Sequence, residues 1–192
     1  MLDLAAGKFS SFTPSLLQDP RNKNGPPRIP LIMIEEGTAG DIWFVPDDEY
    51  DRLSLYDSHA NKWEVTPQYC TSLAANAHTL FIGQGGRISS LLGGNDEGPP
   101  GLSYLNFEDG QWRDLKQVPE LPRYTVTTLA PAGDNLWVGG VGYVALIDVQ
   151  ENKVIKFAYI PAGSVEQIEL AGGYLWTLFN GYLHRTPLPG GE

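Results

Sequence analysis

The sequence has few of the residues that mark disulfide-bonded, membrane-spanning or nucleic-acid-binding proteins. Its one cysteine, Cys70, cannot form an internal disulfide, so stability must come from packing. No apolar run approaches the roughly 18 residues that a membrane span requires, which predicts no membrane insertion. Lys and Arg number 13 against 23 Asp and Glu, and this formal charge of −10 argues against nucleic acid as a partner.

Signals of cellular location are also missing. The N-terminus, MLDLAAGKFSS, has neither the basic stretch nor the apolar core of a signal peptide. If a signal or a larger N-terminal part lies upstream of this sequence, the protein is extracytoplasmic. The compartment therefore stays unknown.

Glycine and proline, by contrast, are abundant. The chain has 22 Gly and 15 Pro spread among short apolar runs, which predicts many turns and an all-β fold. The three histidines lie in different segments, without a second His, Cys or carboxylate at zinc-ligand spacing. Gly140 to Ala145 match the G-x-G-x-x-A dinucleotide fingerprint, but a strand-like segment follows where that motif needs a helix. These glycines instead predict a tight turn.

The five tryptophans occupy two positions of a repeated pattern, which indicates one structural unit copied several times. The first position lies in the short apolar segments IWFV, LFIG, LWVG and LWTL, at Trp43, Phe81, Trp137 and Trp176. The second position is filled by Phe9, Trp63, Trp112 and Val154. We expect the tryptophans to be core residues.

Two nearly constant distances predict two hairpins in each unit. An apolar residue precedes the first aromatic position by eight residues in three units and by nine in the first, with a Gly- or Asn-containing turn between them. Ten residues separate a second apolar position from Trp63, Trp112 and Val154. The turn of this second hairpin begins with an Asp or Asn whose side chain can bond nearby backbone: Asp3, Asp57, Asn106 and Asp148.

Four-stranded antiparallel units of this length predict a β-propeller, in which each blade packs against its neighbours. The strands of a unit are called A to D. We expect a single domain over 1–192, with blades at 29–66, 70–116 and 124–160 and an incomplete blade at 164–188. The N-terminal segment 1–13 contains Lys8–Phe12, a candidate for the missing D strand that would close a ring of about four blades. The alternative is a fragment of a larger propeller with six to eight blades.

The repeat resembles the propeller repeats of bacterial two-component regulators, which read LW-V/I-G-T, then G-L, then a strand ending in Asp. The best match is Leu136-Trp137-Val138-Gly139, followed by Gly142 and by Leu146-Ile147-Asp148. The resemblance spans most of 29–186, although Gln84 and Gly140 replace the Thr. It implies a ligand-sensing or protein-interaction module and carries no catalytic residue.

Variation in length is confined to the B-to-C and D-to-A connections, which emerge on the same face of a propeller. Binding groups usually lie on such loops. Arg and Tyr there could bind an acidic or sugar-like ligand or a protein, or could simply keep the surface soluble. The candidate residues of this ligand-binding face are Arg21, Lys23, Arg28, Asp47, Asp48, Tyr50, Asp51, Arg87, Asp96, Glu97, Arg123 and Tyr124.

Asp47, Asp48, Glu49 and Asp51 place four carboxylates within five residues. Such a loop could supply ligands to Ca²⁺, but its spacing is not that of an EF-hand, so a solvated acidic loop with no cofactor is preferred. The leading functional hypothesis is a non-catalytic binding module. The alternative is a carbohydrate-active enzyme, a glycosidase or lyase, that uses carboxylates such as Asp47, Asp51 or Glu97.

Overall fold

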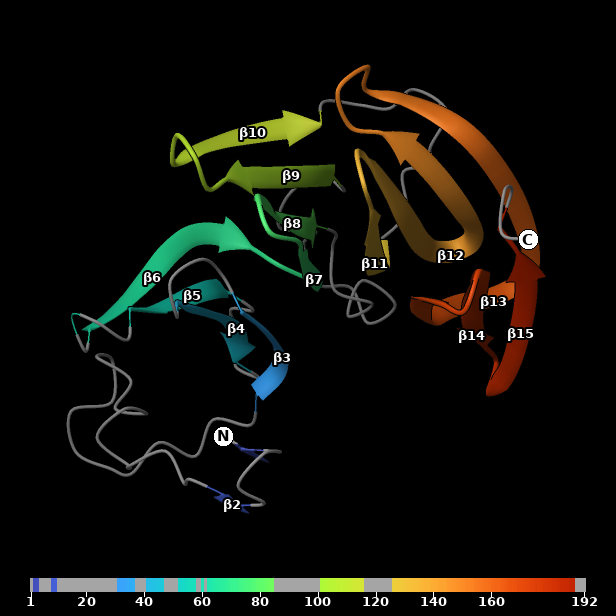
Figure 1. Ribbon diagram of the computed structural model, residues 1–192. Helices are drawn as coiled ribbons and strands as arrows, with labels where there is room; N and C mark the ends of the chain where they lie inside the picture. The colour runs from blue at the N-terminus through green and yellow to red at the C-terminus, as the bar shows by residue number, and fades with distance from the viewer. Residues whose placement is uncertain are drawn as a thin grey trace, which may run out of the picture.

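The computed structural model describes residues 2–3, 8–9, 31–36, 41–46, 52–57, 60, 62–84, 101–115 and 126–188 (Figure 1). Every regular element in these segments is a β-strand. This part of the chain has no helix long and apolar enough to cross a membrane. The prediction of an all-β fold is confirmed.

Two four-stranded antiparallel sheets form the first half of the fold. Unit 1 has the order β3-β4-β5-β6, with strands β3 (Leu31–Glu36), β4 (Ile42–Pro46), β5 (Arg52–Asp57) and β6 (Lys62–Tyr69). Unit 2 has the order β7-β8-β9-β10, with strands β7 (Ser72–Ala75), β8 (Thr79–Gln84), β9 (Gly101–Asn106) and β10 (Gln111–Leu115). Both sheets are the paired hairpins that the spacing predicts.

A five-stranded sheet forms the second half. Its order is β11 (Val126–Ala132), β12 (Asn135–Asp148), β13 (Lys153–Ala171), β14 (Tyr174–Phe179) and β15 (Tyr182–Pro187). β12 folds back on itself at Val141–Gly142, and Gly142 has a positive φ of 83°. The two ends of this hairpin meet where the Val149 N–H donates to the Asp134 carbonyl at 3.4 Å. The predicted tight turn is therefore present within β12.

The β13 strand departs from the predicted boundaries. The sequence predicts a blade that ends at 160 and a separate blade that begins at 164, whereas β13 is continuous from Lys153 to Ala171. Its first part pairs with β12 and its second part with β14. Continuity is maintained because Val141, in the turn of β12, pairs with Ser164 in the short link. We call β11, β12 and the first part of β13 unit 3, and the rest unit 4.

The turn residues of the C-to-D hairpins act as predicted. Asp57 accepts a hydrogen bond from the Ala60 N–H, Asn106 from Glu108 and Asp148 from Glu151, each at 2.8 Å. These side chains compensate for backbone donors that the turn leaves without a partner. The hairpins therefore have the same construction in three units.

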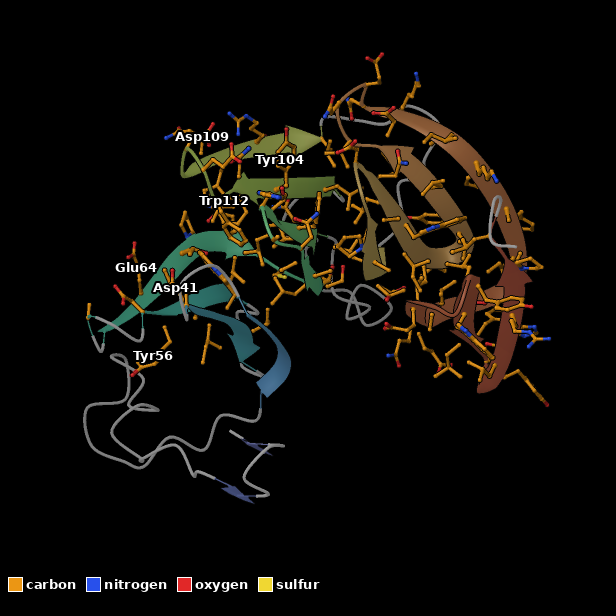
Figure 2. The ribbon with its side chains drawn as sticks, viewed as in Figure 1. Asp41, Tyr56, Glu64, Tyr104, Asp109 and Trp112 are labelled. Atoms are coloured by element: carbon orange, nitrogen blue, oxygen red, sulfur yellow. The ribbon has the colours of Figure 1, made fainter. Side chains whose placement is uncertain are left out.

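The core lies between successive sheets, where the two tryptophan positions meet. The B-strand aromatic of one unit packs toward the next unit: Trp43 and Trp112 lie edge to face with centroids 6.3 Å apart, and Figure 2 labels Trp112 on β10. Phe81 and Val154 share the cluster between units 2 and 3. Trp137 packs into the cluster between units 3 and 4. These three aromatics are core residues as predicted, but Trp176 is only half-buried because no described unit follows it.

The first and last described strands belong to different sheets. β1 (Leu2–Asp3) and β2 (Lys8–Phe9) pair with each other in a two-stranded sheet, and among the described strands β15 pairs with β14 alone. Figure 1 shows the sheets in an arc, with β1 and β2 at one end and β15 at the other. The fold is propeller-like, whereas ring closure by Lys8–Phe12 and the number of blades stay predictions.

Candidate binding face

The register of the strands places the variable connections at one end of each sheet. In unit 2, Ser72 pairs with Gly83, Gly83 with Leu102 and Leu102 with Leu115. The start of β7, the end of β8, the start of β9 and the end of β10 therefore form one row. Gln84 and Gly101, which flank 85–100, pair with each other at this end, and Leu115, which precedes 116–125, lies in the same row. We call this end of the sheets the loop face.

Threonine hydroxyls link neighbouring units by hydrogen bonds at the loop face. The Thr71 Oγ1 lies 2.8 Å from the Val126 carbonyl oxygen of the next unit and 3.1 Å from the Gly83 carbonyl oxygen of its own. Thr127 repeats the arrangement, with 2.5 Å to the Val165 oxygen and 3.2 Å to the Gly139 oxygen. Each hydroxyl has one proton to donate, so the two carbonyls share it. The loop ends of units 2, 3 and 4 are thereby fixed relative to one another.

Two glycines of the repeated motif allow this close approach. A Cβ on Gly83 would lie 2.7 Å from a Val126 methyl, and one on Gly139 would lie 2.9 Å from Val165. Both distances are shorter than side-chain atoms tolerate. A Cβ would come closer still to the A strand of the same unit, 2.1 Å from the Ser72 Oγ at Gly83 and 2.6 Å from the Thr128 Cγ2 at Gly139. The glycine of LFIG and LWVG thus leaves room for both neighbouring strands.

These threonines are not among the residues predicted from the sequence. A signal was present, because Thr71 precedes Gly83 by the same twelve residues that separate Thr127 from Gly139. Cys70, directly before Thr71, is buried and donates from Sγ to the Ser72 carbonyl at 3.0 Å.

Tyr143 lies beside the turn of β12 at the loop face. Its side chain is fully buried, its ring stacks on Phe157 with centroids 6.0 Å apart, and a Cβ on Gly140 would clash with it. Its hydroxyl is a buried group with no hydrogen-bond partner among the described residues. Burial raises the pKa of the Tyr143 phenol to about 12, because the anion would lose its hydration. Tyr143 is therefore a neutral, packed side chain.

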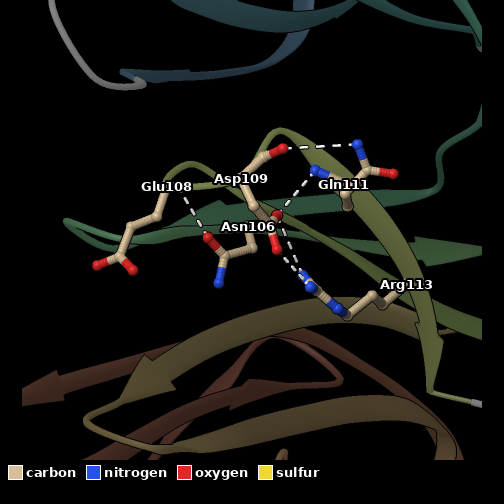
Figure 3. Close-up of polar contacts among 5 residues, drawn as sticks. All are labelled: Asn106, Glu108, Asp109, Gln111 and Arg113. Carbon is tan, nitrogen blue, oxygen red and sulfur yellow. Dashed lines mark hydrogen bonds and ion pairs between the residues drawn. The ribbon is translucent and has the colours of Figure 1, made fainter.

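At the opposite end of unit 2, Asp109 in the turn between β9 and β10 forms an ion pair with Arg113 of β10 (Figure 3). Arg113 donates to Asp109 through both terminal nitrogens, with Nη1 3.3 Å from Oδ1. The hydrogen bond from Arg113, followed by the Gln111 N–H, lowers the pKa of the Asp109 carboxyl. Both side chains are substantially exposed, so the pair orders the turn without burying charge.

The twelve residues predicted for the ligand-binding face all lie outside the described residues, so their convergence stays a prediction. The structure does place the strand ends that flank them, Pro46 and Arg52, Gln84 and Gly101, Leu115 and Val126. Within the described segments, no three His, Cys, Asp or Glu side chains come together as a metal site requires. The acidic loop considered for Ca²⁺ also lies outside them.

Comparison with known proteins identifies a fold but no family. The sequence matches no family model and no curated protein. It is similar in structure to the computationally designed Ika4 protein, with a TM-score of 0.59 and 10% identity over 84% of this chain and 92% of that chain. A chain of the mitotic checkpoint complex gives a TM-score of 0.62 and 12% identity over 83% of this chain. This chain spans about half of the checkpoint protein, 49% of its length. At these identities the likeness concerns the fold alone.

Proposed function

We propose that this chain is a non-catalytic propeller-type module that binds a protein or a small acidic or sugar-like ligand through its loop face. The supporting observation is that Thr71 and Thr127 each donate a hydrogen bond to the next unit, which fixes the strand ends at the loop face relative to one another. This row of strand ends is a rigid base at which the strands that flank 85–100 and 116–125 end or begin. Loops on a rigid scaffold are where proteins usually place binding groups.

The Arg and Tyr side chains of these loops favour an acidic or sugar-like ligand. Arg87 and Arg123 belong to different connections of the loop face, and Tyr124 follows Arg123. Arginine forms paired hydrogen bonds with carboxylates, and tyrosine offers a flat apolar surface for a sugar ring. A binding function agrees with the resemblance of the repeat to two-component-regulator propellers, which implies a ligand-sensing or interaction role. We further propose that the N-terminal strand beginning at Lys8–Phe9 completes unit 4.

Binding is tested with a glycan array that includes uronic-acid oligosaccharides and with a set of acidic peptides. We expect a ligand whose affinity falls at least about tenfold in the Arg87→Ala, Arg123→Ala double variant, equivalent to losing about 1.4 kcal/mol of binding free energy. Arg113→Ala is the matched control, because Arg113 is exposed at the opposite end of unit 2 and should leave binding unchanged.

Three results would contradict the proposal. The first is no binding to either set of probes. The second is an equal loss of affinity in the Arg113→Ala control. The third is hydrolysis or elimination of an array glycan that Asp47→Asn abolishes, which would identify a carbohydrate-active enzyme instead.

A further inference from the structure

Each contact between units 1, 2 and 3 combines an aromatic residue from one unit with a D-strand residue from the next. Trp112 of β10 packs on Trp43, and Val154 of β13 packs in the cluster that contains Phe81. Trp137 is the third residue of this kind and faces unit 4. Unit 4 ends at β15, its C strand, so among the described residues no D strand packs on Trp137.

The outer edge of β15, which no other described strand pairs with, is suited to such a strand. The Leu188 N–H donates to the Gly173 carbonyl at 2.9 Å, which fixes the alternation of hydrogen bonds between β14 and β15. By that alternation, Leu183 and Arg185 direct their N–H and C=O groups away from β14. The side chains of β15 are exposed throughout. A strand added here would continue the sheet by backbone hydrogen bonds.

The strand that fits this edge is Lys8–Phe9. Asp3 pairs with Lys8 in β1 and β2 as Asp57 pairs with Lys62, Asn106 with Gln111 and Asp148 with Lys153. Lys8–Phe9 therefore has the register of a D strand, and Phe9 corresponds to Trp112. Transferred to unit 4, with β15 in the place that β1 holds, the register pairs Lys8 with Pro187 and Phe9 with Thr186. Phe9 then takes toward Trp137 the position that Trp112 takes toward Trp43.

The position of Lys8–Phe9 in the chain indicates which unit it completes. A D strand precedes the A strand of the next unit, as β6 precedes β7 and β10 precedes the segment that leads to β11. The unit that Lys8–Phe9 completes must therefore lie directly before unit 1. In the structure, β3 packs on β7, β7 on β11 and β11 on β13, whereas unit 4 lies at the other end of the arc from unit 1 (Figure 1).

We propose that two copies of this chain join head to tail, and that the Lys8–Phe9 strand of each copy completes unit 4 of the other. Unit 1 of one copy then packs on the outer face of unit 4 of the other, which carries half-buried Trp176 and Leu183, 65% exposed. Two such contacts related by a two-fold axis close a ring of eight units, within the size range of propellers. The inference rests on the proposed completion of unit 4 and specifies where the strand comes from.

The mass in solution is the first test, by light scattering during size-exclusion chromatography. We expect twice the 21.1 kDa of one chain. Leu183→Asp should yield a folded monomer, since it places a charge in the contact without disturbing a buried residue. Tyr159→Asp, at a site 73% exposed on β13, is the matched control and should remain a dimer. A monomeric wild-type protein, or a dimer unaffected by Leu183→Asp, would overturn the proposal.

A disulfide then identifies the source of the strand. Lys8→Cys with Pro187→Cys places cysteines at paired positions of an antiparallel ladder, about 5.5 Å apart between Cα atoms and within disulfide reach. Mild oxidation of an equal mixture of ¹⁴N- and ¹⁵N-labelled double variant should give a covalent dimer whose linked peptides combine both isotopes. Linkage within one chain would overturn strand exchange but keep the completion of unit 4. Absence of any linkage would refute both.

Discussion

Replacing Trp137 by alanine measures how strongly one unit holds the next. Trp137 is a buried side chain that packs with Val165, Ile168 and Leu175 of unit 4. Truncation leaves a cavity between two sheets that the paired strands prevent from collapsing. Losses of buried aromatic side chains of this kind cost about 3 to 5 kcal/mol in the free energy of unfolding. For a chain of this length, that corresponds to a melting temperature lower by about 6 to 20 °C.

Urea denaturation followed by circular dichroism gives the free energy of unfolding, and thermal melts give an independent estimate. Trp137→Phe is the control, because Phe81 fills the equivalent place in unit 2; we expect a loss of about 1 to 2 kcal/mol. Both variants should be compared at one protein concentration. Stability of Trp137→Ala within about 1 kcal/mol of wild type would refute the packing of units through this position.

Three further substitutions test the contacts at the loop face. Gly139→Ala should cost about 1 to 3 kcal/mol by forcing a Cβ against Thr128 and Val165. The cost should exceed that of Gly110→Ala, whose Cβ meets open space and whose cost is limited to its positive φ; equal denaturation midpoints would contradict this. Thr127→Val should cost about 1 kcal/mol in urea denaturation, because it removes the hydroxyl that bridges units 3 and 4; no loss would show that the bridge contributes nothing. Tyr143→Phe should not reduce stability, because it removes a buried hydroxyl without a partner among the described residues; a loss above about 1 kcal/mol would reveal a hydrogen bond there. Burial raises the pKa of Tyr143 from 10.0 to about 12 in the folded state, so this group does not alter stability below pH 10, and the free energy of unfolding falls as the pH rises from 10 to 12. Denaturation in alkaline buffers should show this slope in wild type and less of it in Tyr143→Phe.

The repeat was predictable because it is built from local interactions. A hairpin needs a turn of fixed length and an alternation of apolar residues, and both can be counted along the chain. The Asp and Asn turn residues followed the same logic, since each side chain bonds backbone two or three residues away. These features were found where the sequence predicted them.

The contacts between units were not predictable in the same way. Thr71 meets Val126, and Trp43 meets Trp112, across 55 and 69 residues of sequence. The pattern showed that the two tryptophan positions exist but not that they meet across a sheet interface. The continuity of β13 was also not predicted. It depends on a pairing between Ser164 and Val141, which lies in the turn of β12 and not in the neighbouring sequence.

The sequence alone determined an all-β chain of repeated hairpins, because turns and alternation act within about ten residues. Only the tertiary structure decided which faces are covered. It buries Trp43, Phe81 and Trp137 under the next unit and leaves Trp176 half-buried, although all four occupy the same position of the repeat. The physical reason is that burial depends on a neighbouring sheet, and a residue pattern within one unit does not contain its neighbour.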